Sequence, residues 1–132
     1  MSLLLDTHYV IWLAISPEIL TDRELDLLAA HAGETWISAA SLWEIKLKWE
    51  LRHPSGDRKG AISPARALDF ARAADFRVEP LYPELFALAL DAPSASDDPF
   101  DALLLLQAQS LGLRLLTRDR RLVDHPLAYR FG

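Results

Sequence analysis

The stretch DPFDALLLLQAQSLGLRLLTRD, residues 98–119, carries the signals of one helix followed by one strand. Asp98-Pro99 is a helix cap followed by a first-turn proline, and the apolar residues after it predict a helix from Phe100 to Leu111. Gly112 suits the end of that helix, because glycine tolerates the left-handed backbone conformation. The apolar run from Leu113 to Leu116 predicts a buried strand. A long helix that leads directly into a strand is typical of α/β domains.

The rest of the chain repeats this alternation of short apolar runs and longer helical patterns. We expect strands at residues 3–5, 35–37 and 76–79, and helices after Asp6, after Thr21, over 38–49, after Ser63-Pro64 and from Pro83 through Leu90. Thr21 and Glu24 have the spacing of a capping box, and the helix that begins there is expected to bury Leu25, Leu28 and Ala29. Residues 52–60 form a polar loop rich in helix breakers.

Strands that are separated by helices need crossover connections, which favour parallel pairing. We therefore expect an α/β fold, a three-layer α/β/α sandwich with a mostly parallel sheet of four or five strands. The 132 residues, 51% of them hydrophobic and 25% charged, suit a single domain over residues 1–132 with its own core.

Composition excludes several classes of site. The chain has no cysteine, which excludes zinc ribbons, cysteine nucleophiles, iron–sulfur clusters and disulfide frameworks, and its four histidines are too scattered for a zinc site. Fourteen basic against 19 acidic residues give a net charge of −5, which bears little on nucleic-acid binding if metal ions neutralise some of the acids. No run reaches the roughly 20 apolar residues of a membrane span, so we expect a cytoplasmic protein with nothing cleaved and no membrane contact.

Two carboxylates follow predicted strands. Asp6 comes directly after residues 3–5, and Asp119 comes shortly after residues 113–116. Ligands of open parallel sheets bind beyond the carboxyl ends of the strands, so these two side chains converge if their strands are neighbours. The alternative is that each one caps the helix that follows it.

Two more acids lie near the start of the helix that opens at Pro99. Asp101 is surrounded along the helix by apolar residues, and a buried carboxylate is costly unless a metal or a basic group neutralises it. Its first-turn position near the helix dipole is a structural alternative. Asp98 is explained as a helix cap, and we assign it no more than a supporting position beside the site.

Glu44 completes a set of four acids, with Asp6, Asp101 and Asp119, each near the end of a predicted strand or helix. Alone, Glu44 could form an ordinary surface ion pair with Lys48. Together, four hard carboxylates without thiol or imidazole favour Mg²⁺, with Mn²⁺ as a substitute. One or two such ions can activate water and neutralise a phosphodiester, which is nuclease chemistry.

Basic residues flank this set in two segments, with five Lys or Arg between residues 46 and 60 and four Arg between 114 and 121. They could bind a phosphate backbone, although most single Lys and Arg residues simply face solvent. Lys48 and Arg118 are our candidate RNA contacts.

These residues resemble the PIN-domain ribonucleases, specifically the VapC-like toxins of bacterial toxin–antitoxin pairs. The resemblance runs along the chain through LLLDTHYVIWL (3–13), SAASLWEIKLK (38–48), DPFDALLLLQAQ (98–109) and LLTRD (115–119). It implies that the metal ligands are Asp6, Glu44, Asp101 and Asp119, with a supporting hydroxyl at Thr117. It also implies Mg²⁺-dependent cleavage of RNA to a 5′-phosphate and a 3′-hydroxyl, a VapB-like antitoxin and a homodimer.

The chain departs from that family pattern at the edges of the site. Many members of the subgroup have a histidine where this chain has Ser96, often an arginine where it has Ala102, and commonly an aromatic residue where Arg120-Arg121 follow the last motif. These differences bear on substrate choice, and a tRNA loop, ribosomal RNA or messenger RNA all remain open. A receiver-like signalling domain is one alternative, but the adjacent acids and late lysine of that fold are missing. A non-catalytic PIN-fold binding module is the other.

Overall fold

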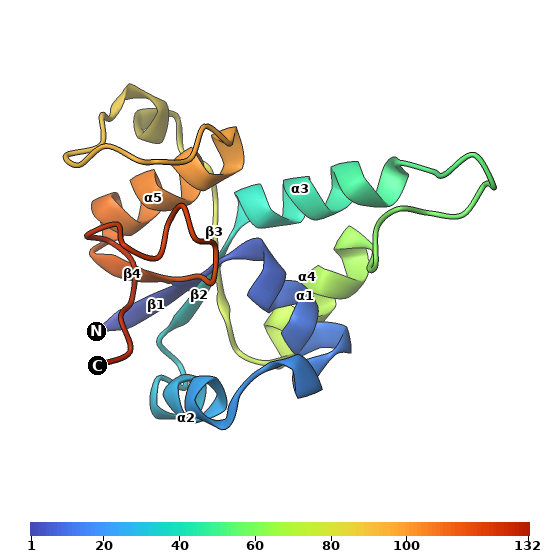
Figure 1. Ribbon diagram of the computed structural model, residues 1–132, viewed down its shortest axis with the longest axis horizontal. Coiled ribbons are helices and arrows are strands. Elements are labelled where there is room, and N and C mark those ends of the chain that lie inside the picture. The colour runs from blue at the N-terminus through green and yellow to red at the C-terminus, as the bar shows by residue number, and fades with distance from the viewer.

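The computed structural model describes residues 1–132 and contains a four-stranded, entirely parallel sheet in the order β3-β2-β1-β4 (Figure 1). Along the chain the elements are β1 (Ser2–Leu5), α1 (Thr7–Ile15), η1 (Pro17–Ile19), α2 (Asp22–Ala30), β2 (Thr35–Ser38), α3 (Ala39–Glu50), α4 (Pro64–Ala73), β3 (Arg77–Glu79), η2 (Pro83–Ala87), α5 (Pro99–Leu111) and β4 (Leu113–Leu116). The predicted α/β class and parallel sheet are confirmed.

Helices cover both faces of this sheet, because side chains alternate along each strand. Leu3 and Leu5 of β1 pack in one apolar cluster with side chains from α1, α2, α3 and α4. Leu4 lies on the opposite face, in a second cluster with Leu104 and Leu105 of α5. The structure therefore has the predicted three layers, and β1 is buried between two of them.

Local capping signals set the ends of α5. The Asp98 side chain accepts a hydrogen bond from the Phe100 N–H at 2.8 Å, and Gly112 ends the helix in the left-handed conformation at φ +67°. Both features were predicted. The predicted capping box of α2 is also present, with Thr21 and Glu24 each bonded to the other's backbone N–H.

The buried face of α2 differs from the prediction. Leu25 is 40% exposed and Ala29 also faces solvent, whereas Glu24 and Leu27 are buried and Leu28 is half-buried. The face of α2 that carries Glu24 and Leu27 is turned inward, and the Glu24 carboxylate pairs with an arginine on another segment of the chain. A long-range ion pair has overridden the apolar pattern.

The predicted helix from Pro83 through Leu90 is also wrong. Only the short 3₁₀ helix η2 forms, and the backbone is extended at Leu88. The Gln109 side chain of α5 donates to the Ala89 carbonyl at 3.0 Å and accepts the Asp91 N–H at 2.8 Å. These backbone groups are satisfied by α5 instead of by a helix of their own.

Helix α3 projects away from the sheet, and residues 51–63 form a loop at its far end (Figure 1). Its beginning follows β2 directly, with Ser38 as the capping residue. The first half of α3 therefore starts at the carboxyl edge of the sheet. None of the helices is both long enough and apolar enough to cross a membrane.

Candidate active site

Two carboxylates meet where the neighbouring strands β1 and β4 end. Leu5 pairs with Leu116, so Asp6 and Thr117 are the next residues on the two strands. Thr117 Oγ1 donates to Asp6 Oδ2 at 2.6 Å and accepts the backbone N–H of Asp119 at 3.1 Å. One buried hydroxyl thus links the two acids that the sequence placed at strand ends.

Asp6 does not act as a helix cap. It is the first residue before α1, but its side chain makes no capping hydrogen bond and is buried, with the residue 7% exposed. Burial raises the pKa of Asp6, and the nearby Glu44 carboxylate adds to that effect, whereas the Thr117 hydrogen bond and His8 act to lower the pKa. A buried carboxylate in this position is suited to a cation.

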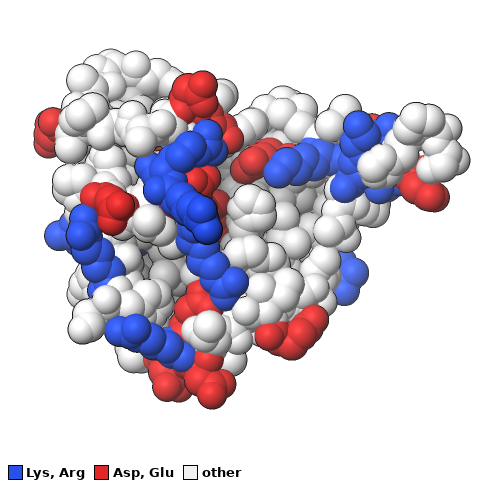
Figure 2. Space-filling view, viewed as in Figure 1, with Lys and Arg blue, Asp and Glu red and all other residues white.

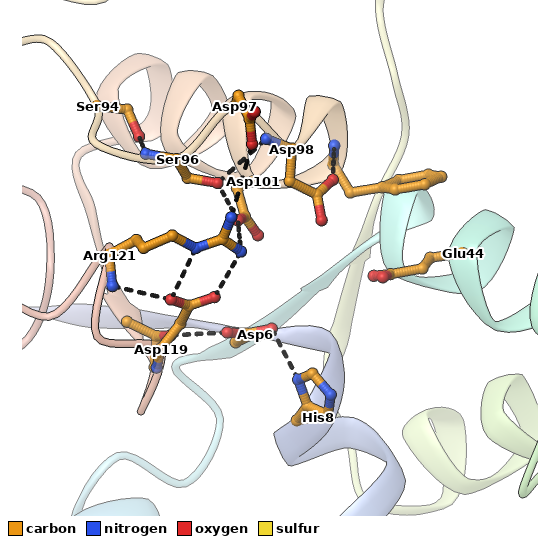
Figure 3. A network of polar contacts seen from close by, with 12 residues as sticks. Asp6, His8, Glu44, Ser94, Ser96, Asp97, Asp98, Asp101, Asp119 and Arg121 are labelled. Carbon is orange, nitrogen blue, oxygen red and sulfur yellow. Dashed lines mark hydrogen bonds and ion pairs between the residues drawn. The ribbon is translucent and has the colours of Figure 1, made fainter.

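Asp101 faces the same edge from the first turn of α5. The residue is 8% exposed, and its Oδ2 accepts a hydrogen bond from Ser96 Oγ at 2.6 Å (Figure 3). Burial raises the pKa of Asp101, and the carboxylates of Asp98, Asp6 and Asp119 raise it further, against the opposing hydrogen bond from Ser96. Asp101 lies on the same side of the sheet as Asp6 and Asp119, the acids that follow β1 and β4 (Figure 3).

Glu44 approaches from α3 and stands apart from the other three acids (Figure 3). Its side chain is 15% exposed, and Oε2 lies 3.5 Å from Lys48 Nζ. The predicted ion pair with Lys48 is therefore present, yet the carboxylate is far less exposed than in the neighbouring Lys46–Glu50 pair, where Glu50 is 55% exposed.

The supporting candidate Asp98 and the candidate RNA contact Arg118 are both engaged in structural contacts. The Asp98 side chain caps α5. Arg118 Nε donates to Glu24 Oε2 at 2.9 Å, its Nη2 contacts the other oxygen of Glu24, and its guanidinium lies 4.6 Å from the centre of the Trp12 ring. Arg118 therefore reaches the site with its charge already paired.

Three further residues lie beside Asp119 and Asp101, namely Arg121, Ser96 and Asp97. The sequence analysis noted Arg121 and Ser96 only as departures from the family pattern and did not note Asp97. Arg121 contacts Asp119, Asp101 and Asp97, and the Arg121 hydrogen bond lowers the pKa of Asp119. Ser96 and Arg121 occupy positions where this chain differs from the VapC-like pattern. That difference was the only signal in the sequence for their place in the site.

A pocket of about 240 Å³ opens at this edge and is lined by Asp6, His8, Tyr9, Trp12, Arg118 and Asp119. In Figure 2, Lys and Arg side chains border this face from two directions, with Asp and Glu atoms visible between them. A larger pocket, of about 360 Å³, lies elsewhere against α5 and is lined by none of the four acids. Chemistry, not size, identifies the site.

Comparison with known proteins identifies the family to which the chain belongs. The family model described as PIN domain matches residues 3–126. The chain belongs to the PIN-domain family. The PIN domain is also 30% identical over 125 residues to Ribonuclease VapC22 of Mycobacterium tuberculosis (strain ATCC 25618 / H37Rv), an alignment that covers 94% of this chain and 92% of that protein. Family and relative support a nuclease, the class expected from the acids.

The acids of this PIN domain fit a divalent metal by their chemistry. Their donors are carboxylate oxygens, which Mg²⁺ and Mn²⁺ prefer. In the present arrangement no three carboxylate or imidazole side chains converge closely enough to coordinate one ion. Burial raises the pKa of Asp6 and of Asp101, and repulsion from neighbouring carboxylates raises both further. A bound cation would relieve that repulsion and draw these side chains together.

Asp101→Asn is expected to melt no lower than the wild-type PIN domain in chelator at pH 7, and up to about 4 °C higher. The folded pKa of Asp101 lies above its ordinary value of 3.8, so the ionised carboxylate costs stability at neutral pH. That cost disappears as the pH falls below the folded pKa, so the difference between the two proteins should shrink toward pH 4. Thermal unfolding at both pH values measures it.

Asp97→Asn is the matched control, because the Asp97 side chain is fully exposed. Its melting temperature should stay at the wild-type value. A clearly lower melting temperature for Asp101→Asn would instead assign Asp101 a structural role at the start of α5.

Proposed function

We propose that this PIN domain is a Mg²⁺-dependent endoribonuclease, the toxin of a toxin–antitoxin pair, and that Mn²⁺ can replace Mg²⁺. The observation that carries the proposal is the placement of four carboxylates at one edge of the sheet by four separate elements. Asp6 after β1, Asp101 on α5 and Asp119 after β4 lie near one another, and Glu44 on α3 faces them from further away. Two of the four acids are buried at a cost in free energy.

The residues around the acids hold the carboxylates in place. Thr117 fixes the Asp6 carboxylate through a 2.6 Å hydrogen bond, and Ser96 does the same for Asp101. We assign Asp6, Glu44, Asp101 and Asp119 as the metal ligands. When bound, the metal supplies Lewis-acid chemistry, activating water and neutralising charge on the phosphodiester.

Lys48 is the cation that we assign to the RNA backbone on the α3 side. Its side chain is 47% exposed and lies one helical turn from Glu44, with the ammonium 3.5 Å from the carboxylate. It can therefore neutralise a phosphate beside the acids. Arg118 has a smaller share in our proposal, because Glu24 already pairs with its guanidinium.

The proposed partners follow the resemblance to VapC-like toxins. We propose a VapB-like antitoxin and a homodimer, with the protein acting in the cytoplasm, where its RNA substrate is. The apolar groove between α3 and α4, lined in part by Leu42, Trp43 and Leu68, offers the antitoxin a surface, and Trp43 is 52% exposed. Aromatic side chains of this kind are common anchors in interfaces.

Cleavage of total cellular RNA by antitoxin-free protein tests the proposal. Discrete cuts should appear with Mg²⁺, disappear with chelator, and leave 5′-phosphate ends that sequencing can map. Protein that is folded and binds Mn²⁺ but makes no cuts would favour the non-catalytic binding module. The receiver-like alternative has no support from the family comparison.

Glu44→Gln should reduce the rate of cleavage at least tenfold, which corresponds to about 1.4 kcal/mol of transition-state stabilisation. The control is Glu50→Gln on the same helix, because Glu50 also pairs with a lysine one turn away but is 55% exposed. Single-turnover rates at saturating Mg²⁺ compare the two variants. Equal rates would remove Glu44 from the site and leave it as half of a surface ion pair.

Lys48→Ala should weaken RNA binding about threefold to fivefold and reduce the salt dependence of binding, because one phosphate contact is lost. Lys46→Ala is the control, since Lys46 is 45% exposed and pairs with Glu50. Filter binding of RNA to the Asp6→Asn protein at several salt concentrations separates binding from cleavage. A similar loss in both lysine variants would indicate a general charge effect.

A further inference from the structure

Arg121 lies over the acidic site as a cation supplied by the chain itself (Figure 3). Its Nη2 is 3.2 Å from Asp119 Oδ2 and 3.7 Å from Asp101 Oδ2, and its Nη1 is 3.6 Å from Asp97 Oδ1. One guanidinium thus contacts carboxylates from the start of α5 and from the segment after β4. Its neighbour Arg120 makes no hydrogen bond or ion pair.

Both oxygens of Asp119 are engaged by Arg121. Oδ1 accepts the Arg121 backbone N–H at 2.9 Å and faces Nε at 3.4 Å, while Oδ2 faces Nη2. These oxygens and Oδ2 of Asp101 are the ones that a metal at the proposed site would need. A guanidinium and a divalent ion compete for the same carboxylate oxygens, because the two cations repel each other.

We propose that Arg121 is a resident counter-ion that competes with the metal for Asp101 and Asp119, and that metal binding displaces its guanidinium. This inference rests on the proposed function, since it assumes that these acids bind a divalent ion. In the metal-free protein Arg121 offsets the repulsion between the two carboxylates. Its removal therefore leaves a site that binds metal more tightly.

The position of the arginine allows this exchange. The Arg121 side chain is 48% exposed, so it can leave the carboxylates without disturbing the core. The Asp97 side chain is fully exposed and contacts Nη1, so it remains as a partner for the displaced guanidinium. The backbone hydrogen bond from Arg121 to Asp119 belongs to the turn and can persist when the side chain moves.

Arg121→Gln should bind Mn²⁺ about threefold to tenfold more tightly than the wild-type protein, the range expected for loss of a partly exposed ion pair. The matched control is Arg120→Gln, which removes the same charge one residue away and should leave the dissociation constant within about twofold of wild type. Calorimetric titration of chelator-treated protein with Mn²⁺ gives the constants without any assay of activity.

A second readout follows the side chain directly. The ¹⁵N signal of the Arg121 Nε–H, assigned by its absence from the Arg121→Gln spectrum, should shift when Mg²⁺ is added to the wild-type protein. An unchanged signal at saturating Mg²⁺ would contradict displacement.

The titrations distinguish failure of this inference from failure of the proposed function. If neither wild type nor Arg121→Gln binds Mn²⁺, the metal site fails and the inference fails with it. If both bind and Arg121→Gln binds equally or more weakly, the metal site stands and the competing role of Arg121 is overturned.

Discussion

Asp6→Asn is expected to lower the rate of Mg²⁺-dependent RNA cleavage about a thousandfold while the protein keeps its fold. The metal contributes several kcal/mol to such reactions, and about 4 kcal/mol corresponds to a factor of a thousand. Asp6 is the most buried of the four acids, and its carboxylate is held by Thr117. Loss of its charge should therefore weaken the metal site more than any other single amide substitution.

The fold should tolerate this change because asparagine has nearly the same shape as aspartate, and its carbonyl oxygen can still accept the Thr117 hydrogen bond. Burial raises the pKa of Asp6, so the ionised carboxylate does not stabilise the metal-free protein. The melting temperature in chelator should remain within about 2 °C of wild type or rise.

Asp69→Asn is a matched control on α4, where Asp69 is exposed and makes no ion pair. It should cleave at the wild-type rate. Cleavage by Asp6→Asn at the wild-type rate would remove Asp6 from the ligand set. A large fall in melting temperature would instead show that the lost activity reflects a damaged fold.

Glu24→Gln is expected to lower the free energy of unfolding by about 2 kcal/mol at pH 7, because it breaks an ion pair whose carboxylate is buried and whose guanidinium is 38% exposed and partly screened by solvent. Glu24 is 4% exposed and accepts hydrogen bonds from Arg118, Tyr9 and the Thr21 backbone N–H. For a protein of this size, the melting temperature should fall by about 7 °C.

The same contacts predict how stability depends on pH. Burial acts to raise the pKa of Glu24, but the hydrogen bonds from Arg118, Thr21 and Tyr9 outweigh it and lower the pKa to about 2, from an ordinary value of 4.5. A carboxylate with a lowered folded pKa stabilises the fold above its unfolded pKa, and that contribution is lost as the pH falls toward the folded pKa. The gap between wild type and Glu24→Gln should therefore narrow from pH 4.5 to pH 2.

Urea unfolding at a series of pH values measures both effects, and Glu18→Gln serves as the control because Glu18 is exposed on η1 and makes no ion pair. Glu18→Gln should leave stability unchanged. Equal stability of Glu24→Gln and wild type at pH 7 would show that burial of the carboxylate offsets all that its partners contribute.

Asp6 and Asp119 were expected at the carboxyl edge of the sheet only because each follows a predicted strand. Runs of buried leucine mark β1 and β4, and a residue that directly follows a parallel strand must lie at its carboxyl edge. The sequence did not show whether β1 and β4 are neighbours, and the convergence of Asp6 and Asp119 depends on that. The pairing of Leu5 with Leu116 supplies that condition and brings Asp6 to Thr117, 111 residues away in sequence.

Local chemistry in the sequence determined where helices begin and end. Helix ends are set by the caps and by one glycine, at Thr21, Ser63, Asp98 and Gly112. These residues act through hydrogen bonds and dihedral preferences within a few residues, so their effect does not depend on how the domain packs. Where a local pattern lacked such signals, as after Pro83, a side chain from α5 decided the outcome.

Only the tertiary structure decided which charges neutralise one another. The pairing of Glu24 with Arg118 spans 94 residues and turns α2 away from its apolar pattern, and the place of Arg121 depends on how α5 packs against β4. The energy of a Coulomb interaction depends on the distance between the charges in space and not on their separation in sequence. The sequence by itself therefore determined the class of fold and the set of acids, and the packing of the chain determined the partner of each charge.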